Sequence, residues 1–165
     1  MPLLPYNPGY LPSEESPEPG ATIELHLLGY PPYKDRSRSI RNPGHRIHSR
    51  FANLRQEAYR AMAGRARYEG PIRLDLLMLA PDFERGRMLF DYTGGVMDCL
   101  DGSHGPSFTY LPVVYEDDCQ VCDGLSSFKV ASEVEYFVRI VFMGAGPADE
   151  PGWADSAAKL VEEKA

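Results

Sequence analysis

Apolar residues recur along this chain in two spacings, which predict β-strands and α-helices. Alternation at every second position indicates a strand, and a spacing of three and four positions indicates a helix. In chain order the pattern predicts a strand at 22–28, a helix at about 50–63, a strand at 72–79, a short helix at 91–102, and strands at about 120–130 and 133–143. This order predicts an α+β domain with a small mixed β-sheet and two main helices packed on one face.

The first predicted helix has recognisable ends. Ser49 is the expected N-cap, because its hydroxyl can accept a hydrogen bond from a free backbone N–H, and Gly64 is the expected end. The apolar stripe of the helix begins at Phe51. We expect the arginines at positions 50, 55 and 60 to lie off this stripe.

The second predicted helix contains two adjacent glycines. Asp91 can cap its start and Gly102 can end it. Gly94 and Gly95 each lower helix stability by roughly 1 kcal/mol relative to alanine. We therefore expect a backbone or a ligand to approach the helix closely at this point.

Composition divides the chain into three parts. Residues 1–20 contain six prolines and no lysine or arginine, which indicates a proline-rich arm. Residues 21–144 form the predicted domain, and residues 145–165 a Gly/Pro linker with a short C-terminal helix. The sequence lacks the layout of a signal peptide and an 18-residue apolar run, and it has three cysteines, an odd number. We therefore expect a cytoplasmic protein with no membrane contact.

Charge is unevenly distributed along the chain, although the net charge is −7. Residues 34–67 hold ten basic and two acidic residues, whereas residues 68–144 hold five basic and thirteen acidic residues. A basic segment beside an acidic one suits a protein that binds a polyanion with one part and cations with the other. The alternative is a solvated arginine-rich helix and loop.

Three adjacent acids, Glu116 to Asp118, follow a loop at 103–112 and an apolar, β-prone run. Neighbouring carboxylates repel one another unless water or a cation relieves the repulsion. Mg²⁺ is one solution, because it binds through one or two carboxylates and leaves room for phosphate oxygens. A solvated turn between two strands is the other.

These parts together resemble the RusA family of Holliday-junction resolvases, which are endonucleases common in phages and prophages. The resemblance covers about Thr22 to Met143 and includes a first strand ending in a Pro-Pro element, followed by a basic loop and a helix. Two short motifs carry most of it. They are Val96-Met97-Asp98-Cys99-Leu100 at the end of the second helix, and Asp117-Asp118-Cys119-Gln120-Val121 just after Tyr115.

The resemblance implies a homodimeric, Mg²⁺-dependent endonuclease, with Mn²⁺ as an alternative ion, that nicks symmetric strands of a four-way DNA junction in recombination and repair. In the family, three aspartates hold the metal. Two lie in an Asp-x-Asp-Asn motif and one is the second acid of the Asp-Asp pair. Asp118 matches that last aspartate, and Asp91 stands for the second. The sequence departs from the family at Leu89, which replaces the first aspartate, and at Gly94-Gly95, which replaces a helix lysine.

The resemblance, the nearby acids and the distribution of basic residues together predict three sets of site residues. The metal ligands are Asp91, Asp98 and Asp118, and the catalytic carboxylates are Asp91, Asp117 and Asp118. Glu116 and Asp82 are further candidates for the missing carboxylate. The predicted contacts to DNA phosphates are Lys34, Arg36, Arg38, Arg41, Arg46, Arg50, Arg85 and Arg87.

Two other function classes stay open at this point. One is a catalytically weakened RusA-like module that binds branched DNA without efficient cleavage. The other is a protein-interaction domain that uses the acidic face and the two tails. We expect a homodimer, since the strand at 134–142 and the Gly94-Gly95 helix offer surfaces that a second copy can cover.

Overall fold

We analysed a computed structural model of the protein, which describes residues 15–104, 109–110 and 112–144. Within these residues no helix is long and apolar enough to cross a membrane. The predicted arm at 1–20 is described only from residue 15, and there Ser16 Oγ donates to the backbone oxygen of Arg67 at 2.7 Å. The predicted linker and helix at 145–165 lie outside the described residues.

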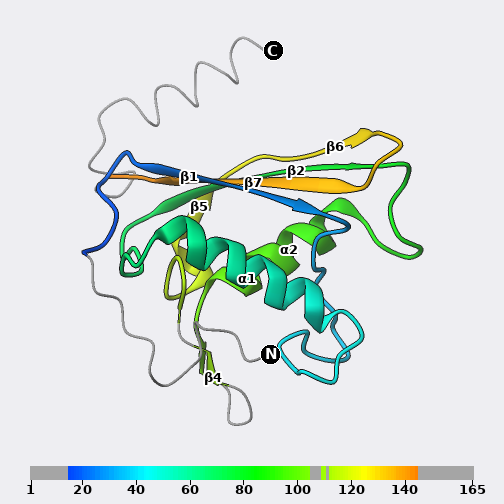
Figure 1. Ribbon diagram of the computed structural model, residues 1–165, viewed down its shortest axis with the longest axis horizontal. Helices are drawn as coiled ribbons and strands as arrows, with labels where there is room; N and C mark the ends of the chain where they lie inside the picture. The colour runs from blue at the N-terminus through cyan, green and yellow to red at the C-terminus, as the bar shows by residue number, and fades with distance from the viewer. Residues whose placement is uncertain (1–14, 105–108, 111, 145–165) are drawn as a thin grey trace.

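The fold is built on a five-stranded mixed sheet, in which β7 and β2 are the central strands (Figure 1). β7 is antiparallel to β1 on one side and to β2 on the other, whereas β5 and β6 both pair parallel with β2. Val138 is therefore flanked by Leu25 and Leu76 across three strands. The strands are β1 (Thr22–Leu28), β2 (Ile72–Ala80), β5 (Val121–Asp123), β6 (Ser126–Val130) and β7 (Glu135–Phe142).

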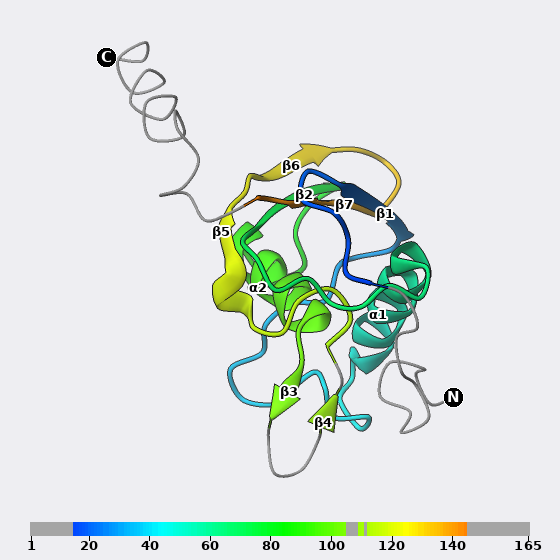
Figure 2. The same ribbon diagram turned by 90° about the vertical axis from the view of Figure 1, so that its left-hand side faces the viewer.

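Two helices, α1 (His48–Met62) and α2 (Leu89–Leu100), cover one face of this sheet (Figures 1 and 2). Alternate residues of β1, β2 and β7 are buried beneath them, as the period of two in the sequence requires. The predicted α+β class, with a mixed sheet and two helices on one face, is confirmed.

The predicted strand at 120–130 is wrong as a single element. The chain instead forms a short 3₁₀ helix, η2 (Asp118–Gln120), and then the separate strands β5 and β6. Gly124 lies at the break. A β-carbon there would lie 2.0 Å from the backbone oxygen of Leu74, so the bend brings two backbones too close for any side chain.

The predicted ends of the helices are also partly wrong. α1 begins after Ile47 without a side-chain cap, and Ser49 lies inside the helix. Ala63, rather than Gly64, is the first residue at its end with left-handed backbone geometry. α2 begins two residues before Asp91 and ends before Asp101.

The predicted loop at 103–112 contains a short two-stranded ribbon, formed by β3 (Ser103–His104) and β4 (Thr109–Tyr110). It projects on the helical side of the molecule, away from the main sheet (Figure 2). The segment that follows it returns the chain to the end of α2.

Gly95 explains the close approach that the paired glycines predicted. A β-carbon at this position would lie 2.3 Å from the backbone oxygen of Pro32 and 2.5 Å from the Cα of Tyr33. The approaching backbone therefore belongs to the same chain. β7 is likewise an interior strand, whose apolar side faces the core. The strand at 134–142 and the Gly94-Gly95 helix, from which the sequence predicts a homodimer, thus both pack within a single copy of the chain.

Candidate metal centre

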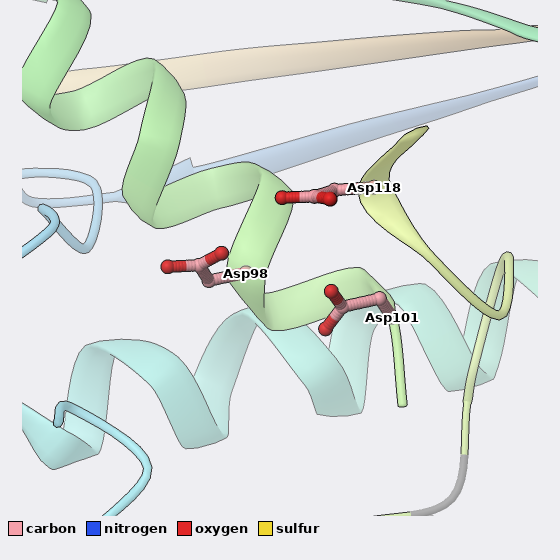
Figure 3. A group of neighbouring side chains, drawn as sticks. All are labelled: Asp98, Asp101 and Asp118. Carbon is pink, nitrogen blue, oxygen red and sulfur yellow. The ribbon is translucent and has the colours of Figure 1, made fainter. Parts of the chain in front are cut away.

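Three carboxylates from two distant segments converge beside the end of α2 (Figure 3). Asp98 belongs to the last turn of α2, Asp101 follows it directly, and Asp118 opens η2. One oxygen of each carboxylate can be chosen so that all three lie within 4.8 Å of one another. The structure therefore joins two of the predicted metal ligands, Asp98 and Asp118, with a third acid that the sequence analysis did not select.

A buried arginine fixes the α2 side of this cluster. Arg55 is wholly buried, and its Nη1 donates to the backbone oxygens of Cys99 at 2.8 Å and Asp101 at 2.9 Å. These carbonyls have no hydrogen-bond partner inside the helix, so the guanidinium supplies one. Its positive charge also interacts favourably with the negative end of the helix dipole. The prediction that Arg55 lies off the buried stripe is wrong. Arg55 follows Phe51 by four positions and so shares its inward face.

Gln120 fixes the Asp118 side. Its Nε2 donates to the backbone oxygens of Tyr68 and Gly70, and its Oε1 accepts from the backbone N–H groups of Glu116 and Asp117. The amide side chain of Gln120 thus holds the turn from Glu116 to Asp118 closed. It also attaches this turn to Tyr68 and Gly70, which lie just before β2.

Tyr115 ties this turn to α2. Its buried hydroxyl donates to the backbone oxygen of Met97 at 2.7 Å. The backbone adds two further bonds, from Val114 N to Leu100 O at 3.0 Å and from Gly102 N to Glu116 O at 3.2 Å. The end of α2 and the segment from Glu116 to Asp118, which together carry the three carboxylates, are therefore held together before any ligand binds.

Burial and mutual repulsion disfavour charge on all three acids. Burial raises the pKa of Asp98, and the nearby charge of Asp118 acts in the same direction. Burial raises the pKa of Asp101 to about 7, although Arg41 opposes the shift. The pKa of Asp118 is raised by burial and then by the adjacent carboxylate of Asp117. A cation placed among them would remove this penalty.

The donor set suits a hard divalent cation. All three groups offer oxygen, which Mg²⁺ and Mn²⁺ prefer over nitrogen or sulfur. Mg²⁺ binds oxygen at about 2.0–2.1 Å in octahedral geometry, so opposite ligands are about 4.2 Å apart. Adjacent ligands of one such ion are about 3.0 Å apart, so the oxygens of Asp98, Asp101 and Asp118, which lie within 4.8 Å of one another, would draw together around it. The residues present therefore fit Mg²⁺ or Mn²⁺.

Two cations of the chain border the cluster. Arg41 Nη2 lies 2.6 Å from Asp101 Oδ1 and donates to the backbone oxygen of Asp98 at 3.0 Å. The positive charge of Lys34 lowers the pKa of both Asp98 and Asp118. Asp101 is therefore shared with an arginine, whereas Asp98 and Asp118 take part in none of the ion pairs among the described residues.

A groove of about 290 Å³ joins Asp98 to the basic loop. Asp98 lies at one wall, and the rest is formed by Lys34 to Arg41. Within it, Lys34, Arg36 and Arg38 are exposed and form no ion pair with a described residue. Cations without carboxylate partners are available for phosphate oxygens, so the structure brings these predicted DNA contacts to Asp98, one of the predicted metal ligands.

The other predicted DNA contacts differ in their surroundings. Arg50 forms an ion pair with Glu84, with 2.6 Å between Nη1 and Oε1. Arg46 donates to the hydroxyl of Tyr33, and the guanidinium of Arg87 lies 3.7 Å from the centre of the same ring. Arg85 is exposed. Arg50 thus has a structural role, while the rest stay candidates for phosphate.

The remaining predicted carboxylates lie apart from the cluster or serve the backbone. Asp91 Oδ2 accepts from the backbone N–H of Met88 at 2.9 Å, at the opposite end of α2. Asp98 follows it by seven helical positions, a rise of about 10 Å. Asp117 Oδ1 accepts from the backbone N–H of Cys119 and so caps η2. Asp101 was missed, although its position three residues after Asp98 placed it on the same helix face.

Comparison with protein-family models and with curated proteins found no match to this chain.

Proposed function

We propose that the protein is a structure-selective DNA endonuclease that resolves four-way junctions by metal-dependent phosphodiester hydrolysis. The observation that carries the proposal is the convergence of Asp98, Asp101 and Asp118 beside a groove that Asp98 and the basic loop line, where Lys34, Arg36 and Arg38 form no ion pair with a described residue. Phosphodiester hydrolysis needs a cation site next to a phosphate site. The resemblance to the RusA family supplies the branched substrate.

Each part of the site has a role in this proposal. Asp98 and Asp118 hold the ion, Mg²⁺ or Mn²⁺, which supplies Lewis acidity toward a phosphoryl oxygen and the attacking water. Arg36 and Arg38 bind flanking phosphates from the groove. Arg55 and Gln120 keep the two carboxylates in place, since each bonds the backbone beside one of them.

Lys34 compensates for one departure from the family pattern. A β-carbon at Gly94, where the family carries a helix lysine, would touch the Cβ and Cδ of Lys34 at 3.5 Å. The lysine of the basic loop thus passes over the helix position that has no side chain. We assign it the stabilisation of negative charge on the reacting phosphate.

The direct test is cleavage of a labelled four-way junction in Mg²⁺ or Mn²⁺. Wild type is expected to give paired nicks. Asp118→Asn keeps the shape and removes a ligand charge, so nicking should fall at least about a hundredfold, while binding of the junction persists. Asp75→Asn, a carboxylate change on the sheet, is the matched control and should cut normally.

Unchanged nicking by Asp118→Asn would contradict the assignment of the site. Paired nicking also needs two active sites related by a two-fold axis, so the proposal includes a homodimer near twice 18.4 kDa by light scattering.

A second candidate is the module that binds branched DNA without efficient cleavage. The ion pair of Asp101 with Arg41 favours it, because it removes one of three carboxylates from the metal. Tight junction binding by a monomer, with no nicks in either metal, would support this candidate.

A further inference from the structure

Six large hydrophobic side chains are exposed among the described residues, and two of them lie at the start of α2. Met88 is 59% exposed just before α2, and Phe90 is 74% exposed in its first turn. The other four belong to the sheet strands or their connections. A single exposed hydrophobic residue needs no explanation, so the surroundings of this pair decide its meaning.

Phe90 shares a face of α2 with the carboxylates. Gly94, Asp98 and Asp101 follow it by four, eight and eleven positions, which places all four on one stripe. At 1.5 Å per residue, Phe90 lies about 12 Å from Asp98 along the axis.

Lys34 occupies the middle of this stripe. Its backbone N–H donates to the backbone oxygen of Asp91 at 2.9 Å, and its side chain lies against Gly94. The surface therefore runs from an exposed aromatic ring, past a cation, to Asp98.

Two arginines lie close in sequence to the aromatic end. Arg85 and Arg87 precede Phe90 by five and three residues, and neither forms an ion pair with a described residue. Arg87 instead lies over the Tyr33 ring. An exposed apolar ring on the same helix face as Lys34, with two arginines just before it in sequence, matches a nucleic-acid strand, which has flat apolar bases on a negative backbone.

We propose that Phe90 stacks on an unpaired base at the branch point of the DNA. Successive bases of a strand are about 3.4 Å apart, so a rise of about 12 Å places this base three or four nucleotides from the phosphate at Asp98. Bases inside an intact duplex are already stacked and are not available to the ring. This inference rests on the proposed endonuclease and explains how it would select branched DNA.

The test uses a four-way junction with 2-aminopurine placed singly at positions across the branch point, in chelator so that no cleavage occurs. Wild type should change the fluorescence most at one position, three or four nucleotides from the nick found in metal. Phe90→Ala should abolish that change and weaken junction binding roughly tenfold, with duplex affinity unchanged. Phe90→Tyr should restore both, and Val130→Ala, which removes a 78% exposed side chain elsewhere, should behave as wild type.

The outcomes separate this inference from the function on which it rests. If Phe90→Ala binds the junction with wild-type affinity and fluorescence, the stacking role is overturned and the endonuclease stands. If wild type binds no DNA, both are overturned. Phe90→Ala should also bind Mn²⁺ like wild type, since a weakened metal site would show that the substitution acts through the fold.

Discussion

Arg73 holds two carboxylates on the sheet, whereas in the candidate metal centre one of three carboxylates, Asp101, forms an ion pair with a described arginine. Arg73 Nε lies 3.1 Å from Asp75 Oδ1, and its Nη1 lies 3.3 Å from Asp123 Oδ2. Both clusters join acids that are distant in sequence. In the sheet cluster the two acids raise the pKa of Arg73, as expected for a neutralised group. In the metal centre the pKa of each aspartate is raised, and for all three burial is the largest cause.

The comparison teaches that proximity of acids alone does not indicate a cation site. Asp75 Oδ1 also accepts from the backbone N–H of Leu125 at 2.9 Å, so the sheet cluster is satisfied by the chain. In the metal centre the chain places carboxylates together and leaves two of them, Asp98 and Asp118, without an ion pair among the described residues. Of these two clusters, the second is the one whose repulsion an external cation would relieve.

The largest difference in stability should come from the two arginines. Arg55→Met removes the donors to two buried carbonyls and should lower the free energy of unfolding by about 3 kcal/mol or more. Arg73→Met breaks a pair whose arginine side chain is 40% exposed, and should lower it by about 1 kcal/mol or less. Urea unfolding in chelator measures both. Equal losses of unfolding free energy in the two variants would show that Arg55 does not stabilise the end of α2 that carries the carboxylates.

The two clusters should also differ in the pH dependence of stability. In the folded, metal-free protein the three aspartates keep protons that the unfolded chain, with pKa values near 3.8, has already released. Stability is therefore greatest below about pH 4 with respect to these groups and falls as the pH rises toward about 7, the pKa of Asp101.

Urea unfolding between pH 4 and 8 should reveal this fall, and Asp98→Asn should reduce it because it removes one of the repelling charges. Asp123→Asn should leave it unchanged. Asp35, whose pKa is lowered by its bond to His45, acts in the opposite direction but below this range. A stability that rises from pH 4 to 7 in chelator would contradict the balance of charge described here.

A smaller effect is expected in the salt dependence of DNA binding. Arg36→Ala with Arg38→Ala removes two phosphate contacts, so the slope of log K against log salt should flatten by roughly 2. Arg73→Ala with Arg139→Ala removes the same charge from the sheet and should leave the slope unchanged. Equal flattening by both pairs would mean that net charge, and not the groove, binds DNA.

The apolar periodicity was sufficient to predict the fold class and most of the elements. β1 spans the residues expected for it, and β7 differs from expectation by two residues at its start and one at its end. The break at Gly124 was not predictable, because it depends on the backbone of β2, which is distant in sequence. Local pattern specifies the elements, while contacts between elements determine where they are interrupted.

The candidate site shows the same division. Asp98 and Asp118 could be selected because their motifs are local in sequence. Asp101 could also be selected from its spacing of three residues after Asp98, but Arg55 could not, since its role depends on how α1 meets the end of α2. Asp91 was selected as a metal ligand by motif position, and its carboxylate serves the start of α2.

The central claim is that the cluster of Asp98, Asp101 and Asp118 binds a divalent cation through Asp98 and Asp118, and Mn²⁺ titration followed by electron paramagnetic resonance tests it most directly. At pH 8, wild type should bind Mn²⁺, Asp98→Asn should bind at least about tenfold more weakly, and Asp123→Asn should bind like wild type. Equal affinity of wild type and Asp98→Asn for Mn²⁺, or no binding by wild type, would contradict the claim.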